Sequence, residues 1–380
     1  MQRLGVNHTK DKNVGAHALS FNGKDLREFG VHVSGEGTFT APERDVEFVT
    51  IPGRDGDLLV DNGRFLNVAV SYSCGITKNF DENFSRLKAW LQHDPGYHRL
   101  MDSHHPDEHR MAAFVAAIKP DMDAYNETGR FSLEFVCKPQ RFTLAGDVPV
   151  RYYSVAYGSL DASTGKNTAQ TGMSRLGYIE VNPGSEFSLS AIYKSGSQQK
   201  AILAFYTGGK EKLSVSTITA VNRIVSYSGR VPATAAYAQV AWTFGTSGVV
   251  IRNGGVETAY DDYGPVIENP ELFTARPRID IGNGENATVE VNGTRITVSP
   301  YQNVTGCDFI TVDCDLQDCY NGDRNMNAFV SLYSADGGIA YEYPAFSPGD
   351  NAIHTSGYPV ATAASPTIDY LEVTPRWWHT

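Results

Sequence analysis

The sequence has few of the features that mark a membrane protein, a nucleic-acid-binding protein or a disulfide scaffold. No stretch approaches the roughly 20 consecutive apolar residues that a bilayer-spanning helix needs. Charged residues make up 20% of the chain, and with a net charge of -11 no basic patch stands out for phosphate contacts. The five cysteines, an odd number without CxxC spacing, fit a reducing compartment better than a disulfide framework. The first residues lack the apolar run of a signal peptide, so we expect synthesis in the cytoplasm without export through such a peptide.

Signatures of catalysis are also missing from the sequence. It has no P-loop, no GxGxxG fingerprint and no GxSxG nucleophile elbow. Short acidic pairs occur at Asp261 with Asp262 and at Asp313 with Asp315, but such pairs are more often solvated turns or strand edges than glycosidase carboxylates. We therefore expect no enzyme and no cofactor.

Two groups of metal-ligating residue types have spacings that argue against a metal site. Cys307, Cys314 and Cys319 lie close together, yet Cys314 falls within the alternating run FITVDCDL, which is typical of a strand. Residues 102–109, DSHHPDEH, crowd into a proline-broken loop, which favours a solvated loop. We predict no bound metal.

The composition that is present favours β-structure. Gly at 36, Pro at 18, Tyr at 20 and Phe at 18 fit many short strands joined by turns. A length of 380 residues predicts two or three domains.

The first part of the chain alternates between strand and helix patterns. Apolar residues follow a helical spacing at Phe80, Phe84, Leu87 and Leu91, with Asn79 as the expected N-cap and Glu82 three residues on. Period-two runs lie on either side, at residues 68–74 and 131–137, and indicate half-buried strands. We predict an α+β domain over residues 1–148.

The segment IPGRDGDLLVDNGRF, residues 51–65, is rich in turn formers. Pro52-Gly53, Asp55-Gly56 and Asn62-Gly63 each favour a turn, and Leu58 to Val60 gives a short strand between them. We interpret the segment as a hairpin arm on which Arg54 and Asp55 could contact a neighbour. On physical grounds alone, an ordinary surface hairpin is the more favoured interpretation.

Residues 149–263 and 264–380 both show the texture of β-sandwiches. The first segment has short alternating runs such as AILAFYT and AYAQVAWTF, and the second has runs around residues 279–281, 289–291, 296–298 and 368–373. Aromatic rings can stack on sugar faces, which makes four residues candidates for carbohydrate binding: Tyr206, Tyr227, Tyr237 and Trp242. At alternating spacing the same rings fit a sandwich core equally well, Trp242 above all.

Both ends of the chain resemble the distal tail proteins of siphophages and related prophages. Residues 51–65 are similar to that family's Val-Pro-Gly-Arg-Asp-Gly signature, with Ile51 for Val, followed by Pro52, Gly53, Arg54, Asp55 and Gly56. The similarity continues through FSRLKAWL and FSLEFVCKPQRF, and again in RPRIDIGNGENATVEVNG, ITVDCDLQDCY and the closing Pro-Arg-Trp-Trp. It covers roughly residues 17–143 and 266–379, whereas residues 150–262 match only longer members that carry a carbohydrate-binding-type module at such a point.

The resemblance implies a structural role at the tip of a virion tail. Family members form a homohexameric ring through their N-terminal domains, and this ring joins the tail tube protein to the tail-tip protein below. Their galectin-like C-terminal sandwiches project outward and can hold a receptor-binding protein. For this chain the resemblance implies synthesis in the bacterial host cytoplasm and residence at the tail tip. The inserted module could bind host cell-wall polysaccharide, or it could serve as a structural spacer or as a docking platform for another tail protein.

The alternative is a stand-alone carbohydrate-binding or adhesive β-sandwich protein. An adhesin needs no α+β ring domain, so the first 143 residues favour the tail-tip role.

Overall fold

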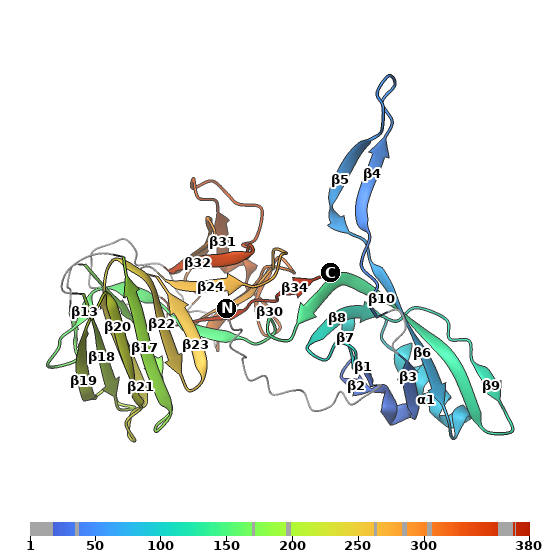
Figure 1. Cartoon of the computed structure of the whole chain (residues 1–380), viewed down its shortest axis with the longest axis horizontal. Helices are drawn as coiled ribbons and strands as arrows, with labels where there is room; N and C mark the ends of the chain where they lie inside the picture. The colour runs from blue at the N-terminus through green and yellow to red at the C-terminus, as the bar shows by residue number, and fades with distance from the viewer. Residues whose placement is uncertain are drawn as a thin grey trace. The chain divides into compact units, whose positions relative to one another are not determined.

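The computed structural model describes residues 18–34, 38–168, 172–194, 199–261, 264–282, 287–301, 306–355, 368 and 370–380. In these ranges the protein is nearly all β, as the composition predicted. It divides into two compact units, Met1–Asp147 with Trp377–Thr380, and Val148–Arg376 (Figure 1). No described helix is long and apolar enough to cross a membrane.

The first unit is built on a nine-stranded sheet, in the order β2-β1-β7-β8-β10-β6-β3, with β9 and β34 also paired to β10. Its strands are β1 (Leu19–Phe21), β2 (Lys24–Asp25), β3 (Val31–Ser34), β6 (Val68–Ile76), β7 (His98–Asp102), β8 (Glu108–Ala113), β9 (Asp121–Asp123), β10 (Thr128–Thr143) and β34 (Trp378–His379). A 3₁₀ helix, η1 (Leu26–Phe29), follows β2.

The two strands predicted from period-two runs pair with each other. In β6 and β10, Val70 lies opposite Phe135 and Tyr72 opposite Leu133, so the apolar faces coincide. The predicted helix is confirmed as α1 (Phe80–Leu91), and its four spaced apolar residues are buried. These residues and the inward faces of β6 and β10 share one core.

The predicted N-cap position is confirmed, but the cap is not made by the side chain. Asn79 is the N-cap residue, but it adopts a left-handed conformation (φ 50°) and its side chain makes no capping hydrogen bond. The Phe80 N–H instead donates to the Glu127 carbonyl at 3.2 Å. A tertiary contact thus replaces the local cap that the sequence favoured.

A separate two-stranded ladder, β4 (Arg44–Val49) with β5 (Leu58–Phe65), forms an arm on the first unit (Figure 1). We call residues 44–65 the arm. The predicted turn at Asn62-Gly63 is wrong, because both residues lie within β5. Between the pairs Arg44–Phe65 and Val46–Asp61 the ladder has one residue on β4 against three on β5, which is a bulge.

The second unit contains three large sheets. One six-stranded sheet has the order β11-β33-β25-β28-β29-β30, and a second has β12-β15-β21-β18-β19 with β16 paired to β21. The third sheet, of nine strands, has the order β20-β17-β22-β23-β24-β32-β26-β27-β31. A small pair, β13-β14, and the 3₁₀ helix η2 (Asn327–Phe329) complete the unit.

Some strands of the second unit alternate buried with more exposed residues, whereas others are buried almost throughout. Before the predicted boundary at residue 263 they are β11 (Val150–Tyr153), β12 (Val155–Tyr157), β13 (Ser159–Leu160), β14 (Asn167–Thr168), β15 (Met173–Leu176), β16 (Ile179–Glu180), β17 (Glu186–Tyr193), β18 (Lys200–Tyr206), β19 (Lys212–Thr219), β20 (Ile224–Arg230), β21 (Tyr237–Thr243), β22 (Thr246–Asn253) and β23 (Val256–Tyr260). After it they are β24 (Pro265–Asn269), β25 (Arg278–Gly282), β26 (Ala287–Val291), β27 (Thr294–Val298), β28 (Phe309–Asp313), β29 (Asp318–Asn321), β30 (Arg324–Asn325), β31 (Val330–Tyr333), β32 (Gly349–Thr355) and β33 (Tyr370–Thr374).

The two units meet in sequence at Asp147–Val148 and again at Arg376–Trp377. The nine-stranded sheet of the second unit contains strands from both sides of residue 263, since β23 pairs with β24 and β24 with β32. The division into 149–263 and 264–380 stays a prediction.

Candidate functional site

The tip of the arm holds the five residues of the turn-rich motif, Pro52 to Gly56. All five are exposed, and both glycines have positive φ (83° at Gly53, 75° at Gly56), a conformation that other residues adopt only with strain. The Thr50 hydroxyl donates to Asp57 Oδ1 at 2.8 Å across the base of the tip loop. Within the described ranges Arg54 and Asp55 form no ion pair, so their charges are available to another molecule.

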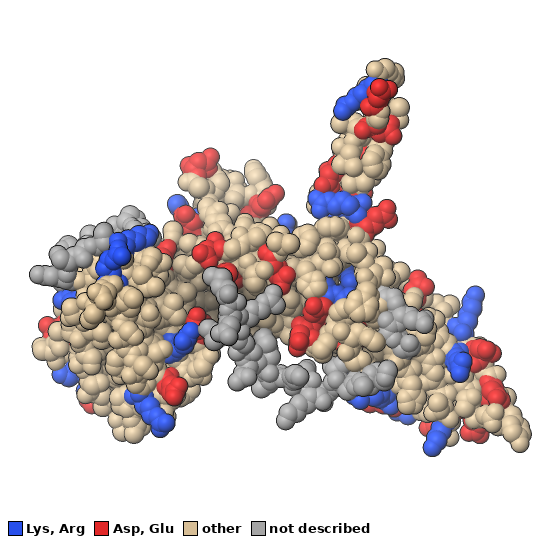
Figure 2. Space-filling view, viewed as in Figure 1, with Lys and Arg blue, Asp and Glu red and all other residues tan. Residues whose placement is uncertain are grey.

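The stem of the arm carries large apolar side chains on both of its faces. Phe48 lies directly opposite Leu59 on one face, and Val49 opposite Leu58 on the other. Phe48 is 63% exposed and Leu59 is 54% exposed. Figure 2 shows charged residues near the tip and at the root of the arm, with an uncharged stretch between them. A ribbon that is apolar on both faces needs a cover from another surface.

The root of the arm is stiffened by ion pairs around the bulge. Arg44 Nη2 lies 2.6 Å from Asp61 Oδ2, and Arg64 Nε lies 2.6 Å from Asp45 Oδ2. The guanidinium of Arg44 also lies 4.9 Å from the centroid of the Phe65 ring. Hydrogen bonds from Arg64 and Asn62 to Asp45, and from Arg44 to Asp61, lower the pKa of both carboxyls. These contacts join the two strands of the arm at its root.

Two buried arginines hold the segment that leads into the arm. Arg141 donates to the Thr38 carbonyl, and Arg110 Nη2 donates to the Thr40 carbonyl at 3.3 Å. Arg141 also lies 3.4 Å from Glu108 Oε2, and the other oxygen of Glu108 lies 2.9 Å from Nε2 of His379 on β34. No motif in the sequence marked these arginines, because one charged residue in an apolar strand pattern does not reveal its partners.

Polar residues of the segment 102–109 form hydrogen bonds within the first unit. Asp102 accepts a hydrogen bond from the buried Tyr72 hydroxyl at 2.8 Å and from the backbone N–H of His104 at 2.9 Å. Burial, followed by the nearby Arg99, lowers the pKa of His109 to about 3, so this imidazole is neutral and its 3.3 Å approach to Asp147 is not an ion pair. Among the described residues, no group of His, Cys, Asp or Glu has the arrangement of a metal site.

The clustered thiols are likewise part of the packing. Cys314 and Cys319 are fully buried, and burial raises the pKa of Cys319 to about 11. Cys319 Sγ lies 3.6 Å from the Tyr343 hydroxyl. All five cysteines are free.

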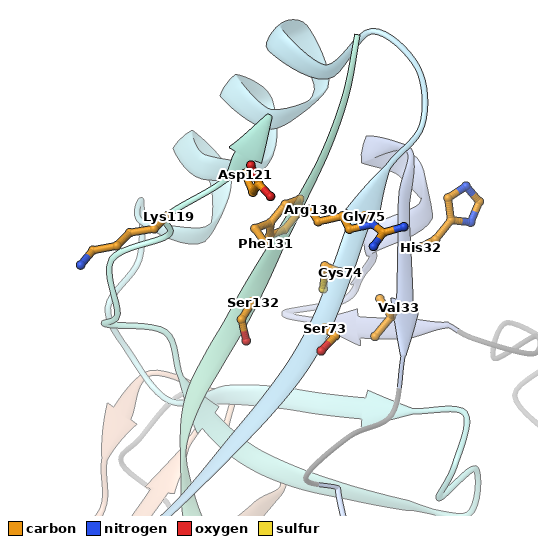
Figure 3. A pocket seen from close by; sticks show the side chains of 10 residues that line it. All are labelled: His32, Val33, Ser73, Cys74, Gly75, Lys119, Asp121, Arg130, Phe131 and Ser132. Carbon is orange, nitrogen blue, oxygen red and sulfur yellow. The ribbon is translucent and has the colours of Figure 1, made fainter. Parts of the chain in front are cut away.

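An open hollow of about 820 Å³ lies on the outer face of β3, β6 and β10. Figure 3 shows Ser73 and Ser132 on neighbouring strands, with Lys119 at one margin and His32 at the other. The Ser132 hydroxyl lies 3.5 Å from the Tyr72 carbonyl, to which it donates, rather than being paired with a catalytic base. The lining of the hollow mixes small side chains with the charged Lys119, Asp121 and Arg130.

The four candidate sugar-stacking residues do not form one group. Trp242 is fully buried, and Tyr206 is 3% exposed with its hydroxyl donating to the Gly165 carbonyl at 2.5 Å. A stacking platform needs an exposed ring face, so these two rings act as core in this conformation. Tyr227 and Tyr237 are partly exposed and lie in different sheets, on β20 and β21.

Tyr237 belongs to an aromatic group that the sequence analysis missed. Tyr178 packs edge-to-face against Tyr206 at 5.2 Å and against Tyr237 at 5.8 Å between ring centroids. The Lys210 ammonium lies 4.7 Å from the centroid of the Tyr178 ring. Tyr178 stands outside a regular strand, and so alternation gave no signal for it.

Comparison with known proteins leaves the family of the chain open. No family model matches it, and no curated protein matches it significantly. A search of solved structures returned the SPP1 Dit protein, described as a paradigm of the hub adsorption apparatus in phages that infect Gram-positive bacteria. It has 10% identity and a TM-score of 0.28, over 60% of this chain and 97% of that one. Two phage P2 baseplate structures also match. The one with strontium has 9% identity and a TM-score of 0.27 over 62% of this chain and 97% of that one. The one with calcium has 7% identity and a TM-score of 0.30 over 94% and 96%. At such scores a likeness does not establish common function.

Proposed function

We propose that the chain is the distal tail protein of a long-tailed phage or prophage, a non-enzymatic subunit of the tail tip. In this proposal six copies form a ring that joins the tail tube protein to the tail-tip protein. Residues 264–380 form a galectin-like sandwich that can hold a receptor-binding protein. Residues 149–263 form a module that binds a host glycan.

The arm is the observation that carries the proposal. Its tip presents the Pro52–Gly56 motif that resembles the family signature, and its stem exposes Phe48 and Leu59. An isolated two-stranded ribbon is only marginally stable in water, and exposed apolar faces on it indicate a docking partner.

In a ring of identical subunits, the arm of one subunit can dock on the next subunit. Cyclic assemblies use heterologous interfaces, in which one surface of a subunit meets a different surface of the next. The arm supplies the first of these surfaces, and the free edges of β4 and β5 supply directional backbone groups for strand addition. The second surface lies on the neighbouring copy.

The test is the solution mass of the full chain, measured by light scattering coupled to size exclusion, alone and with the tail tube protein. We expect a mass close to six chains, and a lower mass for the double variants R54A/D55A and F48S/L59S. Val115, which is 66% exposed on the first unit but lies outside the arm, provides the matched control V115S. If both arm variants kept the mass of the wild type, the arm would have no part in assembly.

A further inference from the structure

One face of the six-stranded sheet β12-β15-β21-β18-β19 carries two cations, Arg175 and Lys210, beside three tyrosine rings that pack on a small buried apolar cluster. We call Arg175, Tyr178, Tyr206, Tyr237 and Lys210 the tyrosine–cation face. Tyr206 and Tyr237 lie directly opposite each other on β18 and β21, and so their rings share one side of the sheet. Tyr178 bridges them edge-to-face.

Arg175 is the most unusual member of the face. Only 4% of it is exposed, and among the described residues its Nε has no hydrogen-bond partner. Burial lowers its pKa, and the groups that act in the opposite direction are the hydroxyls of Tyr178 and Tyr206, with no carboxylate among them. Burying a cation without a counter-ion is costly, which implies that an anion completes this site.

Lys210 adds a second positive charge on the solvent side of the rings. It lies in the tight turn between β18 and β19, where its N–H donates to the Thr207 carbonyl at 2.9 Å and its φ is 61°. Its ammonium stands 4.7 Å from the Tyr178 centroid and 6.0 Å from the Tyr237 centroid. The turn therefore holds the ammonium over the partly exposed rings.

Carboxylates near the face do not cancel both charges. Glu180 lies opposite Tyr237, and its Oε2 is 3.6 Å from Nη1 of Arg151, which also pairs with Glu372 at 3.1 Å. Glu211 follows Lys210 in the turn, and no ion pair of its side chain is described. Two carboxylates thus lie near the face, but in the described part of the chain neither forms an ion pair with Arg175 or Lys210.

We propose that the tyrosine–cation face binds an acidic saccharide, one that bears a carboxylate or phosphate. The inference rests on the proposed glycan binding of residues 149–263 and specifies its site and its charge class. The sugar ring packs against the exposed part of the Tyr237 ring, and its acid group pairs with Lys210, which lies over Tyr178. Arg175 lies on the same side of the sheet as Tyr206 and Tyr237 and attracts the same anion through a medium of low dielectric constant.

The test is calorimetric titration of the full chain with two matched oligomers, one of glucose and one of glucuronic acid, and with inorganic phosphate. We expect the glucuronic acid oligomer to bind about tenfold more tightly than the glucose oligomer, as one charged hydrogen bond would give. K210Q and R175M should each reduce that preference, E211Q should increase it, and Y237A should weaken binding of both oligomers. Lys194, exposed in the same segment, provides the matched control K194Q.

The outcomes separate the two proposals. Equal affinity for both oligomers, or a preference that K210Q leaves unchanged, overturns the acidic-saccharide inference while glycan binding survives. Phosphate that binds as tightly as the glucuronic acid oligomer identifies an anion site without sugar recognition, which also overturns the inference. If neither oligomer binds, the acidic-saccharide inference and the proposed glycan binding are both overturned. Should R175M fail to fold, K210Q and E211Q decide the matter by themselves.

Discussion

Asp313 and Arg376 form the best-defined buried ion pair of the second unit. The two carboxylate oxygens of Asp313 each lie 2.7 Å from a guanidinium nitrogen of Arg376, and the carboxylate is 1% exposed. Burial raises the pKa of Asp313, but hydrogen bonds from Arg376 and from the Leu316 backbone outweigh it, so the net shift is downward. The pair joins two sequence stretches, ITVDCDLQDCY and Pro-Arg-Trp-Trp, that were noted separately for their resemblance to the tail-protein family.

Asp313→Asn should destabilise the second unit by about 3 kcal/mol, because it leaves the Arg376 guanidinium without its counter-ion. Thermal unfolding followed by circular dichroism measures the loss. The double variant D313N/R376M is the control, since replacing both partners removes the unpaired charge and should recover part of the stability. A single variant as stable as the wild type would show that the pair contributes nothing.

The same pair predicts a pH dependence. A carboxyl whose pKa is lower in the folded than in the unfolded state contributes stability that is present above the unfolded pKa and is lost as pH falls through the folded pKa. Acid unfolding of the wild type should therefore steepen below about pH 4, the ordinary range for Asp. In D313N this part of the dependence of stability on pH should disappear. If D313N lost stability at low pH as steeply as the wild type, Asp313 would not be the group responsible.

At the scale of elements, the arm depends on few contacts for its order. Its two strands pair only with each other, and most of their side chains are exposed. The bulge at Asp45, Asp61 and Arg64 ties the strands together at the root, whereas the tip depends on the Thr50–Asp57 hydrogen bond.

We expect hydrogen exchange at the arm to report assembly. In the free chain the backbone amides of β4 and β5 should exchange much faster than those of β6 and β10, because local opening of a two-stranded ribbon costs little. In an assembled ring the same amides should become protected. Mass spectrometry of peptides spanning residues 44–65 in both states makes the comparison, and equal exchange in the two states would place the arm outside the interface.

The sequence predicted elements well where a repeating pattern decided the outcome. Helix α1 and strands β6 and β10 follow from apolar spacing alone, because each buries one face against the same core. The Asn62-Gly63 dipeptide led to the wrong prediction of a hairpin turn. A bulge and a hairpin turn both use a residue with positive φ, and Gly63 adopts a φ of 73° in a bulge. The sequence could not predict features that depend on contacts between strands far apart in the chain. Such features are the burial of Trp242 and Tyr206 and the lack of a counter-ion for Arg175 among the described residues.

At the scale of the whole molecule, the second unit is inserted into the first. Residues 377–380 return to the first unit, where Thr143 N–H donates to the Trp377 carbonyl at 2.9 Å and β34 pairs with β10. Gly146 lies so close to this return that an added Cβ would meet the Trp377 nitrogen at 2.3 Å. Both connections between the units therefore leave from one place on the first unit.

Gly146→Ala should displace the returning strand and lower the stability of the first unit by about 2 kcal/mol, within the usual range for a backbone clash. The readout is the denaturant midpoint of the full chain followed through Trp90, which packs on the core of the first unit. Gly23→Ala is a comparison with positive φ but open space around the added carbon, and it separates steric overlap from backbone strain. A Gly146→Ala midpoint equal to that of the wild type would show that the return strand yields without cost.

The insertion also determines how the chain responds to force and to proteases. A load applied between the units is shared by two covalent connections, at Asp147–Val148 and Arg376–Trp377, rather than concentrated on one linker. A single protease cut at either connection leaves the second unit tethered, and two cuts are needed to release it. Two covalent connections would keep the second unit attached to the first when a mechanical load acts on the protein.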